Sequence, residues 1–172
     1  MPPSPAALEA EISQRILKHW HHAVPNDRMA HLVKDASRSF LRSLQARLAT
    51  TGVSLGHWTF LRILWEHDGV TQRELSHDAG VMEPTTAVAL RAMEELGYIR
   101  RERRAENRKN IYVFLTPKGK ALKRKLVPMA EEVNGLAVRG IDPADLETTR
   151  RCLLVMLDNL ASDEGLAPAP DA

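Results

Sequence analysis

The sequence has 172 residues, of which 44% are hydrophobic and 27% are charged, and its formal net charge is +2. This length and composition predict one domain or two small lobes that share a core, and they exclude a multidomain enzyme and a disordered chain. No apolar run approaches the ~18 residues of a membrane span, and residues 1–5 lack a secretory pattern, so we expect a cytoplasmic protein with no membrane partner. Because Cys152 is the only cysteine, we expect no intramolecular disulfide.

Two amphipathic helices are predicted first. In residues 1–25, an N-terminal extension, an apolar side chain recurs every four positions, at Leu8, Ile12, Ile16 and Trp20. This helix ends near Pro25, because proline cannot continue the helical hydrogen bonds. Asn26 or Asp27 caps a second helix, which continues to about Ala49.

Three more helices follow at closer spacing. The first spans about 55–67 and is apolar on several sides, so we expect it to be central. The next runs from Thr71 to Asp78, with Thr71 as N-cap and Glu74 completing a capping box. After a turn at Gly80, the third occupies 83–96, with proline at an early position and Gly97 as its stop.

The hydrophobic period then changes from 3.6 to two, which predicts strands at 98–101 and 111–115. The segment between them is basic: residues 100–109 hold six bases and two acids, whereas the rest of the chain has two more acids than bases. An isolated charge run is usually a solvated surface. Here the flanking strands predict a β-hairpin with a cationic tip.

The last two predicted helices begin at Thr116-Pro117 and Asp142-Pro143, and each carries a near-heptad apolar seam. The seams consist of Leu122, Leu126, Met129, Val133 and Leu136, and of Leu146, Thr149, Leu153, Met156 and Leu160. They can pack within the chain against the helix of 27–49 or against a second copy, and we expect a homodimer. Residues 26–50 and 117–162 are therefore assigned to a helical dimerisation region, and 163–172 to a flexible tail.

The predicted fold class is mainly α with a small β-hairpin wing: a winged helix-turn-helix lobe at 53–116 attached to the helical dimerisation region. A helix such as 83–96 fits the major groove of DNA, and a basic hairpin tip reaches the neighbouring minor groove. We therefore expect a double-stranded DNA partner. The candidate DNA-binding residues are Thr71, Gln72, Thr85, Thr86, Arg91, Arg103, Arg104, Arg108 and Lys109.

Over about residues 30–160 the sequence resembles the MarR family of transcriptional regulators. The resemblance rests on the stretch Leu55 to Glu66, on Val70-Thr71-Gln72-Arg73-Glu74-Leu75, on the length of 80–97, on Arg100-Arg101 and on Val113-Phe114-Leu115-Thr116-Pro117-Lys118-Gly119. It implies an obligate homodimer that binds a pseudo-palindromic operator. It also implies a repressor that a small ligand releases, often an aromatic acid or a phenol.

The sequence departs from the family pattern at two places. Asn107-Arg108-Lys109 replaces the usual Asp-x-Arg or Asp-Arg-Arg of the wing, so that Glu106 substitutes for the missing acid or the wing is looser. The predicted recognition helix begins with Glu83-Pro84 where the family often has an arginine, and Val88 follows further on. Base reading is then left to Thr85, Thr86 and Arg91.

The resemblance also implies a ligand pocket beneath the second and third helices. Arg38 suits a carboxylate, His57 a hydrogen bond, and Trp20, Phe40 and Trp58 an aromatic ring. Each has an ordinary alternative: core packing for Trp58 and Phe40, a surface ion pair for Arg38, an anchor for Trp20 and a cap for His57.

Two finer resemblances suggest effectors. The extra N-terminal helix with a tryptophan resembles the branch of the family that responds to urate. The segments 82–86 and 106–110 resemble regulators of nicotinate breakdown in proteobacteria, which implies 6-hydroxynicotinate as the effector. A benzoate-type acid also fits the aromatic carboxylate class.

Other functions have less support in the sequence. The histidines His19, His21, His22 and His31 raise a metal site, but no carboxylate or cysteine nearby completes a familiar ligand set, and we expect neither metal nor cofactor. No catalytic motif points to an enzyme, and Cys152 is expected to be a small core residue. The remaining alternatives are a ligand-independent DNA-binding protein and an interaction module whose basic hairpin binds acidic partners.

Overall fold

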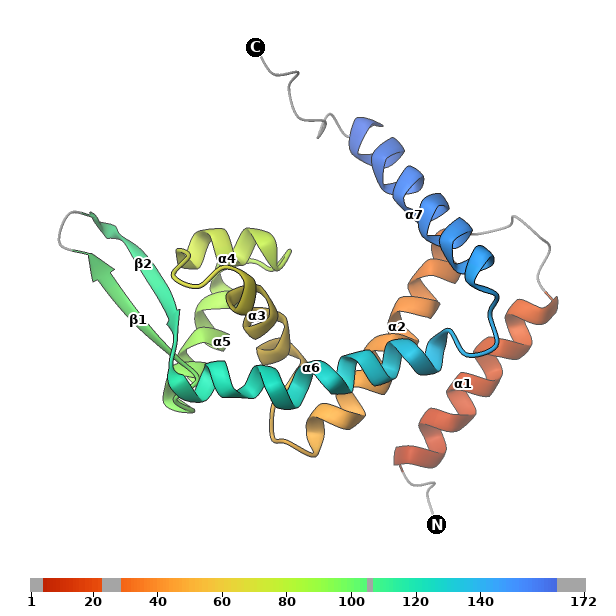
Figure 1. The fold of residues 1–172 in the computed structure, drawn as a ribbon, viewed down its shortest axis with the longest axis horizontal. Helices are drawn as coiled ribbons and strands as arrows, with labels where there is room; N and C mark the ends of the chain where they lie inside the picture. Colours follow the sequence, from red (N-terminus) through yellow and green to blue (C-terminus); the bar gives the residue numbers. More distant parts are fainter. Residues whose placement is uncertain (1–4, 23–28, 105–106, 164–172) are drawn as a thin grey trace. The chain divides into compact units, whose positions relative to one another are not determined.

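The computed structural model describes residues 5–22, 29–104 and 107–163 of the chain (Figure 1). The elements are α1 (Pro5–His22), α2 (Met29–Ala49), α3 (Leu55–Glu66), α4 (Gln72–Asp78), α5 (Glu83–Glu95), β1 (Ile99–Arg104), β2 (Asn107–Leu115), α6 (Pro117–Ala137) and α7 (Pro143–Asp163). The chain divides into two compact units, Met1–Val133 and Asn134–Ala172, and the boundary lies inside α6. None of the helices in the described ranges is long and apolar enough to cross a membrane.

This architecture confirms the predicted fold class: helices with one two-stranded antiparallel hairpin. The helix bounds lie within a few residues of those expected, whereas the expected ends at 23–28 fall outside the described residues. Both strands are longer than predicted, because the alternating basic residues still pair through their backbones. The register joins Ile99 to Leu115 and Arg101 to Val113, with an irregularity between Glu102 and Arg104.

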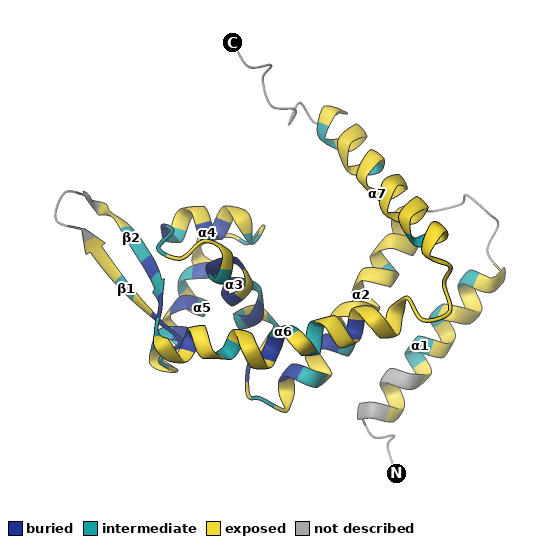
Figure 2. Ribbon diagram, viewed as in Figure 1, coloured by how far each residue is buried: buried dark blue, intermediate teal, exposed yellow. Residues whose placement is uncertain are grey.

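The core of the first unit is built around α3, as its apolar sequence predicts. Five of its twelve residues are buried: Trp58, Phe60, Leu61, Ile63 and Leu64. Leu90 and Met93 of α5 and Ile99 and Val113 of the hairpin belong to the same buried cluster, shown in dark blue in Figure 2. The first helices of the winged lobe and the base of its hairpin therefore share one core.

Three hydroxyl groups, those of Thr71, Ser76 and Thr86, stabilise the helix-turn-helix. Thr71 caps α4 in the predicted capping box: its Oγ1 accepts a hydrogen bond from the Glu74 backbone, and Glu74 Oε2 accepts one from the Thr71 backbone N–H at 2.7 Å. The buried Oγ of Ser76 on α4 lies 2.9 Å from Thr86 Oγ1 on α5 and donates to the Val81 carbonyl at 2.7 Å. The turn between the helices includes Gly80 at φ +61°.

The start of α6 is joined tightly to the lobe. Thr116 Oγ1 accepts from the Gly119 backbone N–H at 3.1 Å and donates to the Gly97 carbonyl at 2.6 Å. A β-carbon at Gly119 would collide with the carbonyl oxygen of Tyr98. Trp65 Nε1 donates to the Gly119 carbonyl at 3.0 Å, so that α3, the hairpin and α6 meet at this glycine.

The seam of α6 packs within the chain as far as Val133, which is one of the two alternatives weighed above. Leu126 and Val133 are buried in the same cluster as Leu44 and Leu48 of α2. The Arg47 guanidinium of α2 also donates to Glu132 Oε1 at 2.9 Å. The C-terminal half of α2 is thus fixed to α6.

The second unit leaves its helix exposed. None of the residues of α7 is buried, and Cys152 is exposed, so the prediction that it is a small core residue is wrong. The described part of this unit, residues 134–163, holds only α7 and the last turn of α6, so the seam has little to pack against within it. The predicted start of the helix is confirmed, because Asp142 Oδ1 accepts from the Ala144 backbone N–H at 2.8 Å.

Candidate nucleic-acid interface

The outer face of α5 carries the predicted base-reading residues that remain accessible. Thr85 and Arg91 are exposed, and Arg91 Nε donates weakly to the Ala87 carbonyl at 3.4 Å. Near the start of the helix, Glu83 lies 3.9 Å from the guanidinium of Arg73 on α4. Arg73 thus offsets the negative charge of Glu83, the acid found where the family often has an arginine.

Two predicted DNA contacts face the interior instead. Thr86 has no exposed surface, and its hydroxyl lies against Ser76 and the Met82 carbonyl, so the prediction that it reads bases is wrong. Thr71 is 8% exposed, and its hydroxyl is engaged with Glu74, which makes it a helix cap rather than a DNA contact. Both threonines follow turns, where a polar side chain serves equally well as a local hydrogen-bond partner. Gln72 is half-buried, and its Oε1 is enclosed with no hydrogen-bond partner among the described residues.

The wing presents cationic side chains along its strands. Arg103 and Lys109 are exposed, as a DNA contact requires. Arg104 and Arg108 lie in the strands, but their side chains are not among those described. Glu106 and the side chain of Asn107 are also outside the described part, so the structure does not test whether Glu106 substitutes for the missing wing acid. These predictions remain untested.

Two arginines at the base of the wing make contacts within the protein. Arg100 pairs with Glu102, and its guanidinium carbon lies 4.4 Å from the centre of the Phe114 ring. Arg101 Nε and Nη2 both donate to Glu94 Oε2 of α5, at 3.0 and 2.7 Å, and its backbone N–H donates to Glu94 Oε1 at 2.7 Å. This Arg101–Glu94 clasp ties β1 to the recognition helix.

The clasp also sets the ionisation of Glu94. Burial alone raises the pKa of this carboxyl, but the hydrogen bonds and the charge of Arg101 together outweigh burial and lower the pKa below its ordinary value. Glu94 is thus held as the carboxylate at neutral pH.

The five predicted ligand-binding residues do not share one environment: some are buried and others are exposed. Trp58 is only 8% exposed and packs edge-to-face on Trp65 at 5.6 Å, which matches the alternative of core packing. Arg38 and Phe40 are exposed on α2, which contradicts the alternative of a core role for Phe40. Trp20 Nε1 donates to Asp35 Oδ2 at 3.1 Å and so anchors α1 to α2.

His57 stands in the first turn of α3, where its backbone N–H is capped by Ser54. Its ring lies edge-to-face on Tyr98 at 6.4 Å. The Nδ1 atom is enclosed without a hydrogen-bond partner in the described part of the chain, and burial lowers the pKa of the imidazole. Because this nitrogen is enclosed, the hydrogen bond from His57 to a ligand stays a prediction.

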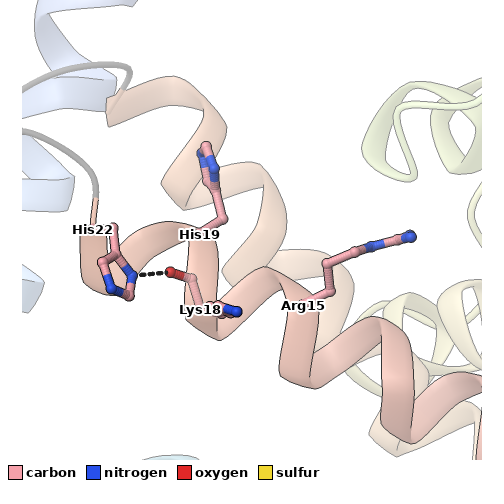
Figure 3. Close-up of a pocket in the computed structure, with 4 residues that line it drawn as sticks. All are labelled: Arg15, Lys18, His19 and His22. Atoms are coloured by element: carbon pink, nitrogen blue, oxygen red, sulfur yellow. Dashed lines mark hydrogen bonds between the residues drawn. The ribbon is translucent and has the colours of Figure 1, made fainter.

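The hollows on α1 are lined by other residues. One of about 420 Å³ lies among Arg15, Lys18, His19 and His22, with His22 Nδ1 2.7 Å from the Lys18 carbonyl oxygen (Figure 3). All four side chains come from one helix, and this makes a cationic surface hollow rather than an enclosed site. Within the described ranges, no group of three or more histidines, cysteines or acids is placed to hold a metal ion.

Three exposed residues near the recognition helix were not among the predicted contacts. Met82 and Val88 are 75% and 62% exposed, and Arg73 on α4 points its charge at solvent. Thr85 and Val88 are three positions apart on one face of the expected helix 83–96, and this spacing is the sequence signal for Val88; Met82 and Arg73 lie outside that helix and have no such signal.

Comparison with known proteins gives a consistent result. The MarR family profile matches residues 53–111. The chain is 28% identical over 137 residues to the HTH-type transcriptional regulator TtmR of Methylorubrum extorquens, covering 80% of this chain and 66% of that protein. The crystal structure of the transcriptional regulator PA3341 is 34% identical, with a TM-score of 0.69, and the match covers 77% of this chain and 98% of that one.

More distant structures share the fold. A MarR family regulator from Listeria monocytogenes, solved with a 26mer DNA, has a TM-score of 0.71 at 19% identity and covers 85% of this chain and 99% of its own. Bordetella bronchiseptica BpsR has a TM-score of 0.67 at 18% identity, with 78% and 99% covered. TtmR, PA3341 and the Listeria protein are each named as transcriptional regulators.

Proposed function

Because the chain belongs to the MarR family of transcriptional regulators, we propose that it is a homodimeric repressor that binds a pseudo-palindromic DNA operator through α5 and the wing. One observation carries the proposal: α5 is buried on one side and presents Thr85, Val88 and Arg91 on the other, next to a hairpin with exposed cations. The distant relative solved with DNA supports the same partner.

Salt dependence tests the DNA partner. A labelled DNA fragment from the region flanking the gene is titrated with protein at two salt concentrations, and fluorescence anisotropy gives the affinity. Release of counterions from several phosphates predicts a steep fall in affinity with salt. Unlabelled unrelated DNA and a polyglutamate peptide serve as competitors. Specific operator binding predicts that neither competitor displaces the labelled fragment, whereas preferential displacement by the peptide would contradict the repressor and support the acidic-partner module.

The homodimer is supported by apolar surface that a single chain leaves open. On α7, the exposed large hydrophobic residues are Leu153, Leu154, Val155, Leu157 and Leu160. On α2, Leu32, Val33 and Leu41 are also exposed. Surfaces of this kind typically mark an interaction site. A second copy covers them in the proposed assembly, and its two lobes read the two half-sites.

The proposed effector is a small aromatic carboxylate such as 6-hydroxynicotinate. The DNA binding of Bordetella bronchiseptica BpsR is described as regulated by 6-hydroxynicotinic acid. In this chain, the exposed guanidinium of Arg38 suits the carboxylate. Trp20, Phe40 and His57 supply aromatic surface and a free acceptor or donor, whereas Trp58 takes no part because it is in the core.

Calorimetry with 6-hydroxynicotinate tests the effector. A ten- to hundredfold loss of operator affinity needs the ligand to favour the DNA-incompetent state by about 1.4–2.8 kcal/mol. Arg38→Ala and His57→Ala should each abolish the response and leave DNA affinity near that of the wild type. Urate and zinc are titrated in parallel. A response to either of these alone would replace the carboxylate assignment without affecting the DNA proposal.

A further inference from the structure

The described part of the winged lobe exposes three large hydrophobic side chains: Met82, Val88 and Leu96. Leu96 lies at the end of α5, where Lys118 Nζ donates to its carbonyl at 2.7 Å. Met82 is the N-cap residue of α5, and Val88 lies six positions further along the chain. The two most exposed of these side chains, Met82 and Val88, therefore lie at the N-cap and in the first half of the recognition helix.

The core does not account for these two side chains. Thr86 and Leu90 are completely buried, and Val88 is two positions from each, or about 200° around the helix. Val88 thus points away from the core. Thr85 stands three positions before Val88 on one face of α5, and the exposed N-cap residue Met82 precedes Thr85 by three positions; we call these three residues the 82–85–88 ridge.

The chemistry of this ridge restricts what it can recognise on DNA. Valine has no hydrogen-bonding group, so it cannot read the donors and acceptors of guanine, cytosine or adenine. The apolar group in the major groove is the C5-methyl of thymine. The surrounding charges suit a polyanion: Arg91 is exposed three positions after Val88, and the acid of the first turn, Glu83, is paired with Arg73.

We propose that Val88 and Met82 contact the C5-methyl groups of thymines in the operator half-site, with Thr85 between them. This inference rests on the proposed function, because it assumes that α5 enters the major groove. It adds a specific property: the bases opposite the first half of α5 are recognised by methyl contacts. Charged or amide side chains would read other bases by hydrogen bonds.

Deoxyuridine provides a sharp probe, because it pairs like thymine and lacks only the methyl group. The operator is located by footprinting on the DNA that flanks the gene, and each half-site thymine is replaced by deoxyuridine in turn. We expect one or two replacements in each half-site to weaken binding by about fourfold per methyl lost, the equivalent of one buried methylene. Fluorescence anisotropy at fixed salt measures the change.

A double-mutant cycle assigns the contact. Val88→Ala should weaken binding to the thymine operator by a similar factor and remove the sensitivity to deoxyuridine at one position. Met82→Ala should remove it at a neighbouring position. Val138→Ala, the same change at a partly exposed residue of the second unit, should keep the full sensitivity. Thermal melting checks that the variants fold. We expect Val88→Ala to fold normally, because Val88 is exposed.

The outcomes separate the two proposals. Tight, salt-dependent binding with equal affinity for thymine and deoxyuridine operators would overturn this inference and leave the DNA-binding function intact. Sensitivity that persists in both Val88→Ala and Met82→Ala would assign the methyl contacts to other groups and also overturn it. Failure of the wild type to bind any DNA would refute the proposed function, and the inference with it.

Discussion

At the scale of single residues, two adjacent threonines of α5 divide stability from recognition. Thr86 is buried against Ser76, and Thr85 is exposed. Thr86→Val should lower the free energy of unfolding by about 1–2 kcal/mol, because a buried hydrogen-bond partner is lost. The operator affinity of the folded variant should stay near that of the wild type. Urea unfolding and anisotropy provide the two measurements.

The matched control is Thr85→Val. It should change stability by less than about 0.5 kcal/mol, as is usual for an exposed site. It should weaken operator binding. If folded Thr86→Val bound the operator much more weakly than the wild type, Thr86 would be a base-reading residue after all.

The wing gives a second prediction at this scale. Arg108→Ala should lower the slope of log affinity against log salt by about one unit, the value expected for one lost phosphate contact. Lys123→Ala is a suitable control. Lys123 belongs to α6 rather than to the wing, and its Nζ lies 3.1 Å from Glu66 Oε1. Equal slopes for the wild type and Arg108→Ala would mean that this arginine is only a solvated charge.

At the scale of elements, the Arg101–Glu94 clasp makes the attachment of the wing dependent on pH. The pKa of Glu94 is lowered in the folded chain, so its contribution to stability is complete above the unfolded pKa near 4.5 and is lost as the pH falls through the folded value. Glu94→Gln should cost about 1 kcal/mol at pH 7, a figure that allows for the partial exposure of the pair.

Urea unfolding at pH 7, 4 and 3 measures this dependence. The gap between the wild type and Glu94→Gln should narrow as the pH falls below about 4.5. Glu95→Gln removes the neighbouring exposed acid and should show no comparable gap at pH 7. A gap for Glu94→Gln that stayed constant with pH would show that the carboxylate charge does not hold the clasp.

The elements also show how far sequence reasoning reaches. The capping box at Thr71 and the stop at Gly97 were predictable, because the chemistry that makes them is local. The inward direction of Thr86 was not, since it depends on Ser76 of a different helix. The sequence likewise marks Trp58 as aromatic but does not show that Trp65 lies beside it. Periodicity locates an element, whereas the direction of one side chain depends on its neighbours in space.

At the scale of the whole molecule, the exposed apolar face of α7 predicts assembly. Leu157 is 65% exposed in the single chain, so Leu157→Glu should leave the fold of each chain largely unchanged. If α7 lies in the dimer interface, the same change places two charges in an apolar contact and should dissociate the dimer. Sedimentation velocity at micromolar concentration distinguishes the two species.

Operator symmetry provides an independent measurement. A dimer predicts half-sites about ten base pairs apart, centre to centre, and Leu157→Glu should lose more affinity for the full operator than for one half-site. Asp158→Ala is the neighbouring control, which should keep the oligomeric state. A wild-type protein that sediments as a monomer and protects an asymmetric footprint would refute the dimer.

Because Gly119 lies directly against the backbone of Tyr98, the first turn of α6 is fixed to the base of the wing and moves with it. The hydrogen bonds of Thr116 and Trp65 leave no free joint between the hairpin and the first turn of this helix. From Pro117 to Val127, before the internal Pro128, the helix is about 16 Å long, so a turn of about 10° at one end moves the other by about 3 Å. A change of tilt in this stretch is therefore passed to the lobe as rotation, and a substitution that loosens Gly119 would uncouple the two ends.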